Sequence, residues 1–165
     1  MIGDAASAAC PVGGDRPLTA GERGLVRGMF HDAIRCDAVR IKRRRFFPLQ
    51  PARVTMAPMG HLHFHPASAV YCDDFALAPV ALQAFFLHEM THVWQAQQRG
   101  KWYLVLMRHP LCRYDYSIRP GWPLARYGIE QQAEIVRHVH LARHGVPVPG
   151  SPGRAALESI LPFGT

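Results

Sequence analysis

The longest helical pattern in the chain lies between residues 80 and 98, where neither glycine nor proline interrupts the sequence. Its apolar residues fall on almost every side of a helix instead of forming one stripe, which is typical of a helix buried all round. Pro79 stands where a first-turn proline is tolerated, and Gly100 stands where helices commonly end. The pattern therefore predicts a helix over 80–98 in the middle of the core.

Two further helices are predicted on either side of this segment. Thr19 and Glu22 have the spacing of a capping box, which begins a helix that runs to about residue 33. After an irregular stretch over 101–126, rich in aromatic residues and proline, a helical pattern resumes at about residue 127 and continues to residue 143. Gly145 is placed to end it.

Strand patterns are fewer and shorter. Apolar and basic residues alternate over 39–42, which predicts a short strand. A second strand pattern covers 54–57 and 60–65, and Pro58 interrupts it, as expected for an edge or bulged strand. Together the elements predict an α+β fold in which a small mixed sheet packs on a buried helix.

The chain is long enough for one domain with flanking segments. Its 165 residues divide into a loose N-terminal arm over 1–17, a domain over 18–145, and a linker with a short C-terminal helix over 146–165. A hydrophobic fraction of 48% and a charged fraction of 19% exclude a disordered chain. Apolar runs are broken well short of about 18 residues, so we expect no membrane partner.

Charge and cysteine content add two expectations. Nineteen Lys and Arg against twelve Asp and Glu give a net charge of +7, partly concentrated in a basic run at 40–45. Such a run beside Phe46 and Phe47 could bind nucleic acid, but a strand edge whose arginines pair with acids is the ordinary interpretation. Four well-separated cysteines and the absence of a secretory leader predict a cytoplasmic protein with free thiols, although export without a leader would leave the same sequence.

The predicted core helix carries the chemistry. His88 and His92 are four residues apart, so both imidazoles lie on one helix face and can bind one ion. Glu89, rotated about 100° from His88, lies beside the ligands and can take a proton from a water on that ion. Polar groups on an otherwise apolar helix need partners, and a metal supplies one. The pattern therefore predicts a Zn²⁺ site with Glu89 as general base.

A catalytic zinc site needs a third protein ligand, and the next predicted helix offers one. Glu130 and Glu134 are again four residues apart and share a face. The economical assignment makes Glu130 the ligand and lets Glu134 accept a hydrogen bond from a ligand imidazole. The reverse assignment remains open, and His138 is a weaker candidate one turn further along.

These residues resemble a known group. His88-Glu-Met-Thr-His92 followed by Glu130 and Glu134 resembles the gluzincins, the zincin metallopeptidases in which HExxH is followed by ExxxD on a later helix. The resemblance implies a zincin-like fold and peptidase activity, with the first acidic residue on zinc and the second orienting a histidine. Glu134 departs from the pattern, where aspartate is usual. The segments 88–95 and 128–135 also resemble small bacterial "vgr-related" proteins, which implies an association with type VI secretion.

Within this frame several other residues are candidates. His61, His63 and His65 alternate, so they are expected on one face of a strand beside the cleft, where an extended substrate pairs. Such a strand could also be a metal site in its own right, or a polar face without a ligand. Tyr114 and Tyr127 are candidates to stabilise an oxyanion, as are Tyr116 and His109.

The sequence therefore predicts a zinc-dependent metallopeptidase acting on a peptide or protein substrate. The alternative is a zinc-stabilised, non-catalytic binding or assembly protein associated with a secretion system. Water access to the ion distinguishes the two, because a structural site has all four positions filled by protein.

Overall fold

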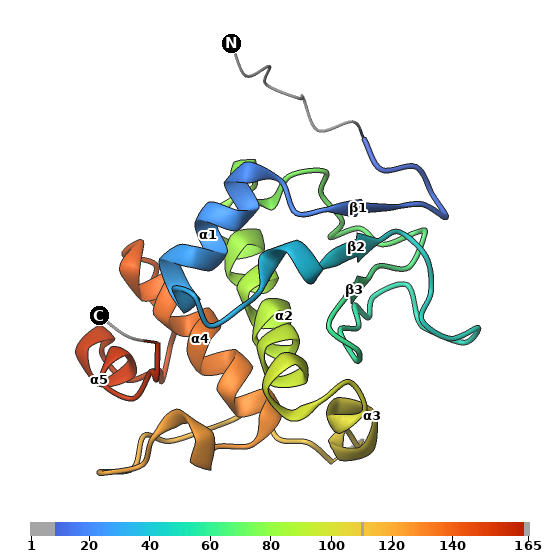
Figure 1. The fold of residues 1–165 in the computed structure, drawn as a ribbon. Coiled ribbons are helices and arrows are strands. Elements are labelled where there is room, and N and C mark those ends of the chain that lie inside the picture. Colours follow the sequence, from blue (N-terminus) through green and yellow to red (C-terminus); the bar gives the residue numbers. More distant parts are fainter. Residues whose placement is uncertain (1–8, 110, 164–165) are drawn as a thin grey trace.

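The computed structural model describes residues 9–109 and 111–163 and has an α+β fold. A sheet of three short strands lies beside a group of helices, of which α2 runs through the middle (Figure 1). The strands are β1 (Asp15–Pro17), β2 (Arg40–Lys42) and β3 (Leu62–His63). The helices are α1 (Ala20–Phe30), α2 (Val80–Arg99), α3 (Tyr103–Met107), α4 (Ile129–Arg143) and α5 (Arg154–Glu158).

Helix α2 is the centre of the core, as its all-round apolar pattern predicts. Phe86, Leu87, Met90 and Val93 are fully buried although they point in different directions. The helix follows Pro79 and ends at Gly100, whose φ of 98° suits glycine. Helix α4 lies along α2 and makes the most extensive contact between any two elements (Figure 1). This pair of helices fixes the position of the candidate site.

A buried ion pair joins the start of α1 to its surroundings. The predicted capping box is present, with the Thr19 hydroxyl accepting from the Glu22 amide at 3.0 Å and the Glu22 carboxylate accepting from the Thr19 amide at 2.9 Å. The same carboxylate accepts two hydrogen bonds of 2.8 Å from Arg16 and one of 3.0 Å from the amide of Phe75. Glu22 thereby links β1, α1 and the segment that leads into α2.

The sheet differs from the predicted one at both ends. Residues 1–8 of the expected N-terminal arm lie outside the described residues, and its last residues form β1, which pairs antiparallel with β2. Strand β3 pairs parallel with β2, and a single antiparallel bridge joins His63 to Met56. The segments 54–57 and 60–65 are therefore not one interrupted strand. The chain turns back between them, at Gly60 with a φ of 84°.

The C-terminal segment packs on the domain. Helix α5 contacts α4, the Leu157 side chain is fully buried, and Arg143 donates to the Glu158 carboxylate at 2.7 Å. Residues 146–153 connect the two helices without regular structure. Within the described ranges, no helix is both long and apolar enough to cross a membrane.

We predict that Glu22→Ala lowers the free energy of unfolding by about 3–5 kcal/mol, because it leaves the Arg16 guanidinium buried without a counter-charge. Urea denaturation followed by circular dichroism measures this. Asp37→Ala is the matched control, since the Asp37 side chain is 93% exposed where it pairs with Arg23. Equal effects of the two substitutions would contradict the structural role given to Glu22.

Candidate metal centre

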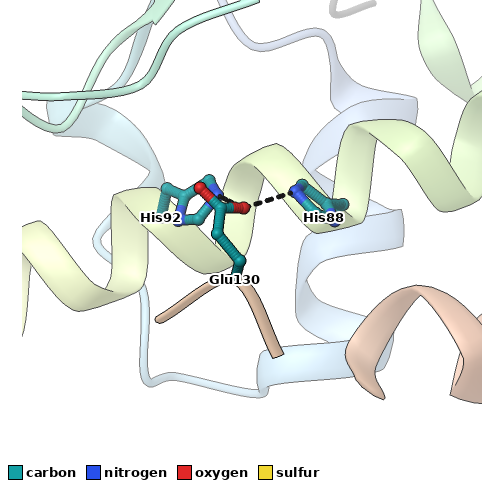
Figure 2. A group of neighbouring side chains, drawn as sticks. All are labelled: His88, His92 and Glu130. Carbon is teal, nitrogen blue, oxygen red and sulfur yellow. Dashed lines mark hydrogen bonds and ion pairs between the residues drawn. The ribbon is translucent and has the colours of Figure 1, made fainter. Parts of the chain in front are cut away.

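Two helices bring three metal-binding side chains together. His88 and His92 project from one face of α2, and Glu130 projects from the first turn of α4 (Figure 2). One Glu130 oxygen, Oε2, lies 3.4 Å from His88 Nε2 and 3.2 Å from His92 Nε2. Ligand atoms of the three residues all lie within 4.8 Å of one another. A single ion could therefore contact all three.

The chemistry of these residues fits a divalent transition metal. Two imidazole nitrogens and one carboxylate are the donor set of a three-ligand zinc site. All three side chains are buried, with Glu130 only 1% exposed. Glu89 Oε2 is buried and has no hydrogen-bond partner among the described residues, whereas Glu130 Oε1 is buried with an ion-pair contact to Arg108. Buried carboxylate oxygens without a partner are costly, and a metal or its water would satisfy them.

The cluster has strong internal electrostatics in the metal-free protein. Burial alone would lower the pKa of His88, but the carboxylates of Glu130 and Glu134 raise it to about 9. Burial alone would raise the pKa of Glu130, but His88, His92 and Arg108 hold it well below its usual range. The metal-free site therefore holds an imidazolium next to a carboxylate at neutral pH.

Glutamine side chains fix the orientation of His92. The Gln95 amide nitrogen donates to the carbonyl of Ile129 and to Gln132 Oε1, both at 2.9 Å, so its oxygen must be an acceptor. That oxygen lies 2.9 Å from His92 Nδ1. The imidazole therefore donates from Nδ1, and Nε2, which lies 3.2 Å from Glu130 Oε2, is the nitrogen directed at the site.

Glu134 orients the other histidine. Its Oε1 lies 2.9 Å from His88 Nδ1, whereas the opposite ring nitrogen faces Glu130. Its Oε2 lies 3.4 Å from His138 Nε2, and the Tyr116 hydroxyl lies 2.6 Å from His138 Nδ1. The geometry favours Glu130 over Glu134 as the third ligand, and His138 contacts Glu134 instead of the ligand cluster. Glu134, His138 and Tyr116 thus form a chain of polar contacts on the Nδ1 side of His88.

Glu89 lies beside the ligands in an adjoining cavity. A cavity of about 420 Å³ is lined by His88 and Glu89 together with side chains from three other parts of the chain. Burial raises the pKa of Glu89. Tyr114 borders the same cavity, and its ring stacks against that of His88 with centroids 6.4 Å apart. A buried carboxylate and a phenol thus face the same space.

The three alternating histidines do not gather at this site. His61 Nδ1 accepts from the Arg40 amide, and His65 Nδ1 accepts from the Ala67 amide. His63 is buried against Phe46, and burial lowers its pKa to about 4. None of the three belongs to the ligand cluster or lines the cavity of Glu89. The structure therefore places these residues away from the cavity of Glu89, and the free edge of β3 is paired at His63 with the backbone of Met56.

Tyr127 also lies away from the cavity of Glu89. Its hydroxyl accepts from the Arg119 amide at 2.9 Å, and it lines a separate cavity of about 550 Å³ behind Glu130. Of the four residues predicted as oxyanion stabilisers, Tyr114, Tyr116, Tyr127 and His109, only Tyr114 lines the cavity of Glu89.

The basic run beside the sheet is largely occupied by contacts within the protein. Arg40 and Arg44 both pair with Asp15. Arg43 donates to the carbonyl of Cys10 and lies over the Tyr71 ring, 4.6 Å from its centroid. These contacts agree with the ordinary interpretation of the basic run as a strand edge whose arginines pair with acids.

Arg108 is a site residue that the sequence did not single out. It follows α3, and its Nε lies 3.2 Å from Glu130 Oε1. It also lines the cavity of Glu89. The irregular segment that carries Arg108 has no periodicity that indicates which side chains turn inward. Gln95 was equally missed, although its place one turn beyond the HExxH motif on α2 could have marked it.

The sequence and the fold are similar to those of known proteins. No protein-family model matches the chain. The type VI secretion system spike protein VgrG2b of Pseudomonas aeruginosa is 36% identical over 136 residues, which cover 78% of this chain. The chain spans 13% of the length of that relative. The solved effector domain of Pseudomonas aeruginosa VgrG2b is 31% identical with a TM-score of 0.69, over 98% of this chain and 89% of that domain.

The chain belongs to the family of the VgrG2b effector domain. The expected membership of the gluzincin family is therefore wrong, since the sequence and structural relatives are this effector domain. The resemblance rested on a few motif residues, which report how ligands are spaced on two helices and say little about the rest of the fold. This member of the family thus contains a three-residue cluster that could hold a metal ion.

We predict that zinc binding to the metal-free protein releases at least one proton at pH 7. His88, with its pKa of about 9, must lose its proton to become a ligand, so affinity should rise roughly tenfold per pH unit up to about pH 9. Protonated His88 also stabilises the metal-free fold fully below the unfolded-state pKa of about 6.5, and this contribution is lost as the pH rises through 9. Calorimetry in buffers of different ionisation enthalpy measures the released protons. A binding heat that does not depend on the buffer would contradict the prediction.

Glu134→Ala should weaken zinc binding about 10- to 100-fold while leaving the ligands in place, because His88 loses the carboxylate beside its Nδ1. Competition with a chromogenic chelator gives the affinities. Glu158→Ala is the control, since this carboxylate pairs with arginines on α4 and α5, away from the ligands. Unchanged affinity in Glu134→Ala would remove the role assigned to that residue.

Proposed function

We propose that this chain is a secretion-system effector domain that hydrolyses peptide bonds with the help of a zinc ion held by His88, His92 and Glu130. The observation that carries the proposal is Glu89, a buried carboxylate that lies next to the ligand cluster and lines a cavity. One of its oxygens has no hydrogen-bond partner among the described residues. A site that only held a structural ion would have no use for such a group.

Zinc in such a site supplies a Lewis acid that lowers the pKa of water towards 7. Glu89 acts as the general base: it accepts a proton from the attacking water and passes it to the leaving amine as the peptide bond breaks. Burial raises the pKa of Glu89, which brings the carboxyl closer to the range where it can both accept and return a proton near neutral pH.

Tyr114 and Arg108 are the hydrogen-bond donors available to the oxygen of the attacked carbonyl. Both line the cavity that contains Glu89. Burial raises the pKa of Tyr114, so the phenol keeps the proton that it would donate. Arg108 is held near the site by its contact with Glu130. Donors fixed before the reaction stabilise a developing negative charge better than mobile ones do.

Thr55 offers a backbone edge on which an extended substrate could pair. Met56 uses both its amide and its carbonyl to bond His63, so the main-chain groups of the preceding residue point away from β3. Thr55 lines the cavity of Glu89, and its main chain bonds to no other described residue. We therefore place the substrate-pairing edge at 54–56, in place of the predicted 60–65.

The secretion-system part of the proposal rests on the relatives. They are a spike protein of a type VI secretion system and its effector domain, which favours the association contained in the non-catalytic alternative. That alternative, a metal-stabilised binding domain, shares the ligands and differs in giving Glu89 no task. Turnover is therefore the property that separates the two.

We predict that Glu89→Gln lowers the rate of peptide hydrolysis about 10²- to 10⁴-fold, because the amide cannot accept the proton of the attacking water. A fluorogenic peptide library measures the rates, and metal analysis shows whether each protein holds the same amount of zinc. Gln98→Ala, at the far end of α2, is the control. Equal hydrolysis by wild type and Glu89→Gln would contradict the role of Glu89 as general base, and no hydrolysis by zinc-loaded wild type would leave the binding-domain alternative.

A further inference from the structure

The cavity of Glu89 is unusually rich in arginine. Three of its ten lining residues are Arg53, Arg108 and Arg137, which come from three separate segments of the chain. The acidic residues that line it are Glu89 and Glu134. Such a concentration of guanidinium groups beside a candidate catalytic carboxylate needs an explanation in terms of what enters the cavity.

Two of these arginines are partly engaged and one is not. Arg108 contacts Glu130 at 3.2 Å, and Arg137 contacts Glu134 at 3.3 Å. The Arg137 side chain remains 42% exposed. Arg53 is exposed and has neither an ion pair nor a side-chain hydrogen bond to any other described residue. Arg53 and the outer part of Arg137 are therefore available to a ligand.

The balance of charge also favours an anion. The three guanidinium groups balance the three carboxylates of Glu89, Glu130 and Glu134. A divalent ion on the ligand cluster then leaves the region with two excess positive charges. An anionic group on the substrate would meet this excess in a partly enclosed space, where charge pairing is stronger than in open water.

Arg53 lies on the segment that leads to the substrate edge. It precedes Thr55 by two residues, and both line the cavity. The Thr55 hydroxyl is buried and has no hydrogen-bond partner among the described residues, so a polar acceptor on a ligand could use it. A peptide paired with the edge at 54–56 would present its side chains next to Arg53.

We propose that the site prefers peptides that carry a carboxylate next to the cleaved bond, and that Arg53 and Arg137 recognise this group. That the carboxylate lies next to a cleaved bond rests on the proposed peptidase function, whereas recognition of the carboxylate is a binding property. The carboxylate could belong to an aspartate or glutamate side chain or to the C-terminus of the substrate, and either source has the same chemistry.

Binding is tested on zinc-loaded Glu89→Gln protein by fluorescence anisotropy. The probes are a short labelled Ala/Gly/Leu peptide with one central Asp and the same peptide with Asn, each with a free and with an amidated C-terminus. The expected result is about tenfold to hundredfold tighter binding of a carboxylate-bearing probe, weakened by salt. The Asp–Asn difference reports a side-chain carboxylate, and the free–amidated difference reports a terminal one.

Arginine variants in the same background locate the recognition. Arg53→Gln and Arg137→Gln should each reduce the preference severalfold or more, and the double variant should abolish it. Arg27→Gln is the matched control, because it removes the same charge from the exposed face of α1, which contributes nothing to this cavity. The proposal is overturned by equal binding of all probes, by no binding of any, or by a preference that survives the double variant.

Cleavage of the same peptides by the wild-type protein separates the two proposals. A carboxylate preference in binding without any turnover contradicts the peptidase function and leaves the recognition intact. Turnover with equal kcat/KM for all four peptides contradicts the recognition and leaves the peptidase function intact.

Discussion

The packing of α2 against α4 buries an ionic cluster, and these charges determine which side chains must surround it. His88, His92 and Glu130 lie on the facing sides of the two helices that pack most extensively, and all three are nearly inaccessible to solvent. Buried charges are tolerated only when they are paired and hydrogen-bonded. The surrounding residues supply that pairing: Gln95 holds one imidazole, Glu134 holds the other, and Arg108 contacts the carboxylate.

The same arrangement prepares the site for chemistry. Contacts on the outer ring nitrogens leave both Nε2 atoms directed at Glu130, so the ligand positions exist before any metal arrives. Glu89, one residue after His88 on α2, lies beside the cluster and lines the cavity. Because neighbouring residues on a helix differ in direction by about 100°, the metal ligand His88 and the proposed base Glu89 have separate positions on α2. The segments around the helix supply the arginines, Tyr114 and the edge at Thr55.

Local periodicity made the helices and the cluster predictable, because the i,i+4 spacings of His88 with His92 and Glu130 with Glu134 fix which groups share a face. Helix α2 ends within one residue of the predicted position. The sheet edge was not predictable, since the turn at Gly60 decides whether 54–57 continues 60–65 or folds back on it. Arg108 comes from a segment without periodicity. The family was also predicted wrongly, because a short motif constrains ligand spacing far more than it constrains ancestry.

We propose that the two helices hold one metal ion that is open to the cavity of Glu89. A crystal structure of zinc-loaded protein, with anomalous scattering recorded at the zinc edge, tests this most directly. We expect one strong peak bonded to His88 Nε2, His92 Nε2 and the Glu130 carboxylate, with a water in the remaining position on the side of Glu89. A peak elsewhere, no peak, or a fourth protein ligand in place of the water would contradict it.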